Sequence, residues 1–211
     1  MPRTRARDAE SKEARRVALL RAACSLFETQ SFAQVTMGEI SAAAGLAKGT
    51  AYLYFTTKEA LFLSLLAQEL EAWFDVLAEA PLRPSKDAPD QVAALFAETL
   101  SERPTLVRLL GLLHLTIEQN VSAELVLPFK LRLAERMGEV GARFEAALPQ
   151  LRPGDGVRLF LRAHALVVGL GQMSQIKPDL DALLAKPELC HLKVQWAPEL
   201  RVCLAAMLRG W

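Results

Sequence analysis

The stretch TMGEISAAAGLAKGTAYLYFTTKEALF, residues 36–62, holds the pattern from which the fold can be predicted. Thr36 and Glu39 stand at the spacing of a capping box, so a helix is predicted to begin directly after Thr36. Gly45 follows after about two turns and permits a tight reversal of the chain. A second short helix is then predicted over 47–53. Two short helices joined by a glycine turn are the arrangement of a helix-turn-helix.

The rest of the chain shows helical periodicity almost throughout. Apolar residues recur at spacings of three and four, and the alternation typical of hairpin strands is absent from the sequence. We therefore predict an all-α protein with an N-terminal three-helix helix-turn-helix domain over 1–56 and a larger helical bundle over 57–211. A long helix over 57–80 is expected to join them. Further helices are predicted over 89–103, 104–119, 122–148, 156–175 and 198–211.

Two of these predicted helices carry finer expectations. Leucines occupy nearly every side of the helix over 104–119, which predicts that it lies buried in the middle of the bundle. Gly169 and Gly171 interrupt the apolar helix over 156–175. We expect another helix to approach the bare backbone closely at those two glycines.

Composition sets limits on the function. The 211 residues are 52% hydrophobic, which is ample for a core, and no run of apolar residues is long enough to cross a bilayer. Residues 1–60 contain nine Lys or Arg against six Asp or Glu, a weak positive excess compatible with a surface that faces phosphates. The three cysteines are too few and too scattered for a disulfide framework, and no export signal is recognisable. A cytoplasmic protein without a membrane partner is expected.

The residue types around the second short helix favour nucleic-acid binding. Lys48, Thr50, Tyr52, Tyr54 and Lys58 supply cations, hydroxyls and aromatic edges within eleven positions, and such groups contact phosphates and bases. For an arbitrary helix pair, the tyrosines would more simply be packing residues and the lysines a solvated face. The clustering on one turn favours the DNA-binding interpretation.

The segment ISAAAGLAKGTAYLYFTTKEAL, residues 40–61, resembles the DNA-binding signature of the tetracycline-repressor (TetR) family, and the resemblance extends over about 12–65. In that family a three-helix DNA-binding domain is joined by a long fourth helix to a helical domain that dimerises and binds an inducer. The resemblance implies phosphate contacts from Thr36, Lys48, Tyr54 and Lys58. It implies that Gly49, Thr50 and Tyr52 face the groove.

Four positions depart from the family pattern. Ser41 stands where a small alanine is usual, Ala51 replaces a larger aliphatic residue, and Leu53 occupies a place that is often aromatic or polar. Ala47 replaces a capping serine, so the second helix is expected to begin without a side-chain cap. The backbone amides of Lys48, Gly49 and Thr50 would then be free to donate to a phosphate.

These features predict a homodimeric repressor that binds double-stranded, two-fold symmetric operator DNA and is released by a small apolar or amphipathic inducer. The helices over 156–175 and 198–211 are expected to pair with their two-fold mates. Polar or aromatic positions on otherwise apolar helices are the candidates for lining the inducer pocket: Trp73, His114, Phe144 and His164. A constitutive DNA-binding regulator whose core is simply filled is the main alternative, and a small all-α enzyme is a distant one.

Signals for other chemistry are weak. His114, His164 and His191 are too widely spaced for a local metal site, so neither a metal nor a cofactor is expected. No paired carboxylates or nucleophile–base pair indicate catalysis, so the protein is not predicted to be an enzyme. Cys203 is interpreted as an inert thiol, and the alternative of a redox role for Cys190 or Cys203 stays open.

Overall fold

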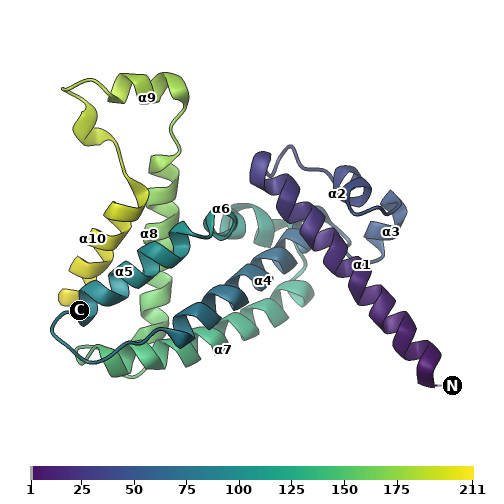
Figure 1. Cartoon of the computed structure of the whole chain (residues 1–211), viewed down its shortest axis with the longest axis horizontal. Helices are drawn as coiled ribbons and strands as arrows, with labels where there is room; N and C mark the ends of the chain where they lie inside the picture. The colour runs from purple at the N-terminus through teal and green to yellow at the C-terminus, as the bar shows by residue number, and fades with distance from the viewer. Residues whose placement is uncertain (1) are drawn as a thin grey trace. The chain divides into compact units, whose positions relative to one another are not determined.

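The computed structural model describes the backbone of residues 2–211 and the side chains of residues 10–177 and 179–211. Within those residues every regular element is helical, as the periodicity predicts (Figure 1). The α-helices are α1 (Pro2–Thr29), α2 (Met37–Ala43), α3 (Lys48–Tyr52), α4 (Lys58–Glu79), α5 (Ala88–Ser101), α6 (Pro104–Leu112), α7 (Ala123–Ala147), α8 (Asp155–Ser174), α9 (Pro178–Leu184) and α10 (Trp196–Arg209). Short π and 3-10 turns span Leu113–Ile117, Glu118–Asn120 and Cys190–Leu192.

The chain forms two compact units. The first comprises 1–68 with 113–127, and the second comprises 69–112 with 128–211. Helix α4 begins in the first unit and ends in the second. The predicted domain boundary after residue 56 precedes this helix and stays a prediction.

The first unit has a small core built from α1, α2, α3 and the start of α4. Phe62 lies fully buried at its centre, with the ring of Phe27 at 5.2 Å and the ring of Phe32 at 4.9 Å, both edge-to-face. Ile40 of α2 and Ala51 of α3 are also fully buried. Each short helix is thus held by very few apolar side chains, which leaves most of its surface to solvent.

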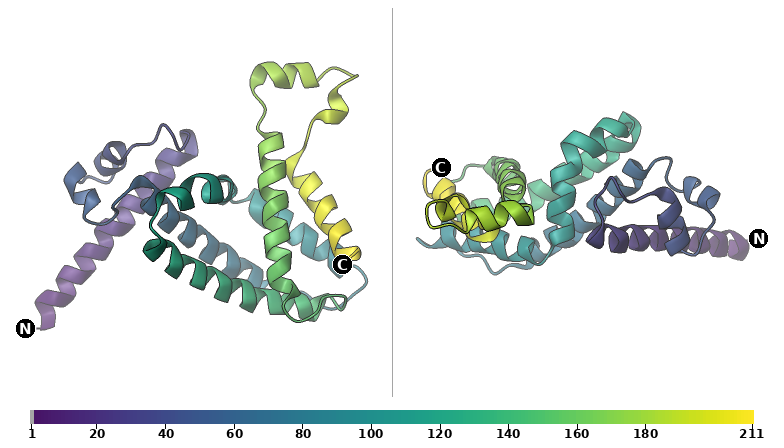
Figure 2. Two further views of the ribbon diagram at one scale, coloured as in Figure 1. Left: turned by 180° about the vertical axis from the view of Figure 1, so that it is seen from behind. Right: turned by 90° about the horizontal axis from the view of Figure 1, so that it is seen from above.

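The second unit is organised around an aromatic cluster. Five rings from four helices lie within 6.0 Å of at least one other ring centroid: Trp73, Phe74, Phe96, Phe144 and Phe160. All five side chains are buried. Around this cluster α10 packs against α5 and α8, and α6 packs against α8. Figure 2 shows α8 and α10 side by side.

Helix α7 and the start of α8 approach each other closely at a pair of glycines. A Cβ atom built on Gly156 would meet the Gly141 backbone at 2.4 Å, and one on Gly141 would meet the Gly156 backbone at 2.9 Å. Glu145 of α7 also accepts hydrogen bonds from the amides of Gly154 and Gly156, at 2.9 and 2.8 Å. Within the described chain, no helix backbone approaches Gly169 or Gly171 in this way, and the expected approach of another helix there stays a prediction. No atom lies within 4 Å of a Cβ on Gly169, and only the Trp196 side chain approaches Gly171.

The predicted helix over 104–119 is interrupted. Helix α6 ends at Leu112, and a π turn followed by a 3-10 turn continues to Asn120. Leu115 in the π turn is 77% exposed, whereas Leu106, Leu109 and Leu110 of α6 are buried. The expectation of one helix buried on all sides is therefore wrong, because the α-helix ends at Leu112 and Leu115 in the π turn is exposed to solvent.

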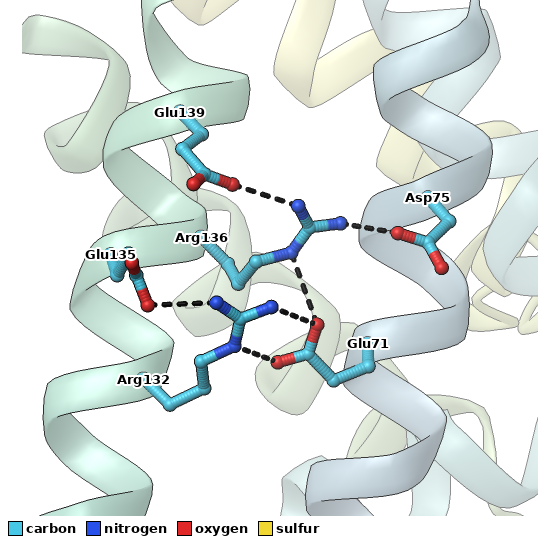
Figure 3. A network of polar contacts seen from close by, with 6 residues as sticks. All are labelled: Glu71, Asp75, Arg132, Glu135, Arg136 and Glu139. Atoms are coloured by element: carbon cyan, nitrogen blue, oxygen red, sulfur yellow. Dashed lines mark hydrogen bonds and ion pairs between the residues drawn. The ribbon is translucent and has the colours of Figure 1, made fainter.

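Polar contacts join α4 to α7 within the second unit (Figure 3). Arg132 donates to both carboxylate oxygens of Glu71, at 2.6 and 3.0 Å, and these bonds hold the pKa of Arg132 above its ordinary value. Arg136 donates to Asp75 at 2.5 Å and to Glu139 at 2.7 Å. The network fixes one face of α4 against α7. Water and salt weaken the pairs of Arg132, whose side chain is 51% exposed, whereas the Arg136 side chain is only 12% exposed.

No helix in the described part of the chain combines the length and apolarity that crossing a bilayer requires.

Candidate nucleic-acid interface

Helix α2 begins with the capping box that its sequence predicts. The Thr36 hydroxyl accepts from the Glu39 amide at 3.2 Å, and the Glu39 carboxylate accepts from the Thr36 amide at 2.9 Å. The hydroxyl of Thr36 also donates to that carboxylate at 2.7 Å. These hydrogen bonds to its charged form hold the pKa of Glu39 below its ordinary value. The start of α2 is therefore fixed by local chemistry.

The turn after α2 is the tight reversal expected at Gly45. This glycine has φ of +68°, a left-handed conformation that L side chains rarely adopt, and the Leu46 amide donates to the Ser41 carbonyl at 2.9 Å. The buried Ser41 hydroxyl donates to the Met37 carbonyl at 2.6 Å, so the polar substitution is accommodated without an unpaired group. The reversal sends the chain directly into α3.

Helix α3 begins without a side-chain cap, as the alanine at position 47 predicts. Ala47 has the extended backbone of an N-cap residue, φ −67° and ψ 145°, and its methyl group offers no acceptor. The expectation that three amides remain free is wrong for Thr50, whose amide donates to the Ala47 carbonyl at 2.9 Å. The uncapped amides are therefore those of Lys48 and Gly49.

Four of the seven predicted DNA contacts lie around one hollow on the first unit. It has a volume of about 580 Å³, and we call it the two-lysine hollow. Its lining consists of Ala33, Val35, Thr36, Met37, Gly38, Lys48, Tyr52, Thr56, Thr57 and Lys58. The start of α2 and one side of α3 thus meet there, with two ammonium groups and several hydroxyls between them.

The remaining predicted contacts lie outside this lining. Gly49 is exposed, and Thr50 and Tyr54 are half-buried. Leu53 at the end of α3 is 80% exposed, and the neighbouring Tyr52 is 44% exposed. The sequence indicated Leu53 only as a departure from the family pattern and not as a contact. All these contact roles stay predictions.

Lys58 differs from Lys48 in its surroundings. The Lys58 ammonium donates to the carbonyls of Phe32 and Val35, at 2.7 and 2.9 Å, and lies 4.1 Å from the centroid of the Phe32 ring. Lys48 is exposed, and among the described side chains none makes a hydrogen bond or ion pair with it. The two lysines line the same hollow, but of the two only Lys58 makes hydrogen bonds with other described residues.

The four predicted pocket residues do not all lie in the same unit. Trp73 and Phe144 both belong to the aromatic cluster, and the Trp73 indole donates to the Thr99 hydroxyl at 2.9 Å. His164 is a half-buried residue of α8 in the same unit. His114 lies in the first unit, its side chain 56% exposed and 3.0 Å from the Glu118 carboxylate. His114 is thus assigned to another unit than the other three. Among the described residues, no group of three potential ligands is placed to hold a metal ion.

Two short helices joined by a tight turn, with exposed lysine and tyrosine on the second, define a helix-turn-helix protein. The chain belongs to the TetR family. Residues 19–65 match the model described as bacterial regulatory proteins of the tetR family, and residues 67–211 match the tetracyclin repressor-like C-terminal domain. The chain is therefore assigned to a family of bacterial regulatory proteins.

Individual relatives agree with the family. The chain is 30% identical over 110 residues to the HTH-type transcriptional regulator EthR of Mycolicibacterium smegmatis, a match that spans 51% of each chain. A TetR/AcrR-family transcriptional regulator from Thermobifida fusca is similar in structure, with a TM-score of 0.54, 18% identity and coverage of 92% of this chain and 96% of that one.

The fatty acid degradation regulator FadR from Bacillus halodurans also has a TM-score of 0.54, with 17% identity and coverage of 92% and 93%. At these identities, both likenesses show the fold alone.

Proposed function

We propose that this regulator is a repressor that binds a two-fold symmetric operator as a homodimer, with α3 in the major groove. The observation that carries the proposal is the surface of α3 beside the two-lysine hollow, where Lys48 is exposed and Tyr52 is 44% exposed. A helix of this size fits the major groove, and lysine and tyrosine contact phosphates and base edges there. Thr36 and Tyr54 would add phosphate contacts on either side.

Exposed apolar residues on α8 and α10 support the homodimer. These two helices pack side by side, and Leu161 of α8 and Val202 of α10 are exposed in the single chain. Gly169 leaves open backbone on α8. Pairing of this face with its two-fold mate would bury apolar surface that is otherwise in contact with water.

The proposed release by an inducer would act through the second unit. A small apolar or amphipathic compound bound near Trp73 would have to favour a conformation that binds DNA less well. Helix α4 is one continuous helix from Lys58 to Glu79 and carries Trp73, which offers a route from one unit to the other.

The competing proposal is a constitutive regulator without an inducer. It is favoured by the packing of the aromatic cluster, in which Phe144 is fully buried and the Trp73 indole is paired with Thr99.

Selection of bound duplexes from a random pool tests the DNA-binding proposal. We expect a two-fold symmetric consensus, and we expect Lys48→Glu to abolish its recovery, because a reversed charge repels phosphate. Lys86→Glu is the matched control, since Lys86 is also exposed but lies in the loop before α5. A consensus without two-fold symmetry would contradict the homodimeric operator complex.

The inducer proposal is tested with Trp196 and Trp211 replaced by Phe, so that Trp73 is the single fluorophore. Compounds that raise the melting temperature and change Trp73 emission are titrated with and without the selected duplex. DNA and compound should weaken each other by the same factor, because coupling between two sites is reciprocal. A compound that occupies the bundle and leaves operator affinity unchanged would favour the constitutive regulator.

A further inference from the structure

Helix α3 has one side that packs into the core of the first unit and another that faces away from it. Ala51 is fully buried on the first side. Leu53, the C-cap residue, still has helical backbone angles, φ −73° and ψ −18°. Because successive residues of a helix are about 100° apart, Leu53 and Gly49 each lie about 200° round the helix from Ala51. Both therefore occupy the side opposite the core.

This outer side of α3 is distinct from the side that lines the two-lysine hollow. Lys48 and Tyr52 are one turn apart and belong to that lining, whereas Gly49 and Leu53 do not. Gly49 is exposed, and a Cβ atom added to it would meet nothing within 4 Å. Leu53 is 80% exposed. Since helical side chains lean toward the N-terminus of their helix, the leucine is directed over the turn that contains Gly49.

The chemistry of Leu53 limits what it can contact. Single exposed leucines are common on protein surfaces, so exposure alone assigns no role. Leu53, however, stands on the outer side of the helix that the proposed function places in the major groove. A leucine side chain has neither donor nor acceptor, so it cannot form hydrogen bonds with the edge of a base. The apolar group that base edges present in the major groove is the 5-methyl group of thymine.

We propose that Leu53 is a specificity-determining residue that contacts the 5-methyl group of one thymine in each half-site of the operator. The inference rests on the proposed DNA-binding function and adds an aliphatic contact to those predicted from the sequence. Gly49 carries no side chain, so this side of α3 can come close to the base pairs. Apolar contact between the leucine and the methyl group removes both from water and favours thymine over cytosine at that position.

Replacement of thymine by uracil tests the contact, because the two bases differ only in that methyl group. Each thymine of the duplex selected by the wild-type chain is replaced by uracil, symmetrically in both half-sites, and affinity is measured by competition. At one symmetric pair of positions, wild-type affinity should fall about fifteenfold, which is about fourfold for each methyl group that loses its contact. Leu53→Ala should bind the thymine duplex less tightly and should lose the uracil effect at that pair.

Two further variants separate a contact with the base from a structural role in α3. Leu53→Met keeps an apolar side chain of similar volume and should retain the uracil effect. Leu53→Gln has a side chain of similar length with a polar end and should lose it. Leu131→Ala is the matched control, since Leu131 is 63% exposed on α7, outside the helix-turn-helix. It should bind the thymine and uracil duplexes as the wild type does.

The outcomes distinguish this proposal from the proposed function. If the wild-type chain selects no duplex, the DNA-binding proposal fails and the contact of Leu53 fails with it. If it selects a duplex but no uracil weakens binding, DNA binding stands and the role of Leu53 is overturned. The same holds if uracil weakens Leu53→Ala and the wild type equally at every position. A uracil effect that is lost in Leu53→Gln and kept in Leu53→Met supports the proposal, and equal effects in these two variants overturn it.

Discussion

The helix-turn-helix segment and the α7–α8 junction are held together in opposite ways. Helices α2 and α3 are short, and local features fix their ends: the capping box at Thr36 and the left-handed Gly45. At the α7–α8 junction, Gly141 and Gly156 bring two backbones together with no room for a methyl group. The first region is determined by polar groups within a few residues of each other, and the second by contact between distant residues.

This difference has a consequence for substitutions. Hydrogen bonds at a helix end are exchanged for bonds to water when they are lost, so each change there costs little stability. A methyl group forced between two packed backbones has no such alternative. We expect substitutions at α2 and α3 to alter DNA binding more than stability, and substitutions at the junction to do the reverse.

The largest effect is expected from Gly141→Ala. Its Cβ would lie 2.9 Å from the Gly156 backbone, so the variant should lose about 3 kcal/mol of unfolding free energy in a denaturant titration. Gly138→Ala is the control on the same helix, where a Cβ meets nothing within 4 Å. That variant should gain about 0.5–1 kcal/mol, because alanine is the better helix former. Equal stabilities of the two variants would mean that the junction opens at little cost.

A smaller effect, on specificity, is expected from Tyr52→Ala. Because Tyr52 is 44% exposed on α3, its removal should lower the unfolding free energy less than removal of a fully buried aromatic side chain would. It should alter relative affinities among operator variants by about 1–3 kcal/mol per affected base pair. Competition binding with single-base operator variants measures this. If all variants weaken by one common factor, Tyr52 only positions the protein on the duplex.

Ala47→Ser should raise the unfolding free energy by about 0.5–2 kcal/mol. The backbone at Ala47 already has the extended conformation of an N-cap, so a serine hydroxyl can accept from an amide in the first turn of α3. Thermal melts of the free protein give the result, with Ala47→Gly as a control that lacks the hydroxyl. A serine variant that is less stable than wild type would argue that the added hydroxyl cannot reach those amides.

The smallest effect is the pH dependence of the α2 capping box. The pKa of Glu39 is lowered by hydrogen bonds from Thr36, so its stabilisation is present above the ordinary carboxyl pKa and is lost as the pH falls below about 4. Amide exchange at the start of α2, corrected for intrinsic rates, should therefore show faster opening on acidification. Glu39→Gln should remove this dependence, and a persistent dependence in that variant would assign it to another group.

Sequence reasoning was accurate where the cause of a structure is local. The start of α2 after Thr36, the reversal at Gly45 and the uncapped start of α3 were all predicted, because neighbouring residues determine each. It did not identify the close approach of Gly141 and Gly156, since Gly156 and Gly169 look alike in sequence and only the position of α7 distinguishes them. The π turn after Leu112 was missed for a similar reason, because a leucine-rich segment gives the same periodicity on both sides of the break.

By itself, the sequence determined that this chain is all helical and that it carries a helix-turn-helix of the TetR type, because caps, turns and apolar spacing act over a few residues. Only the tertiary structure decided which groups those residues face. It placed the Lys58 ammonium on the carbonyls of Phe32 and Val35, and it assigned His114 to a different unit from Trp73. The physical reason is that hydrogen bonds and packing depend on distances across the fold, and residues far apart in the chain set those distances only when the helices pack.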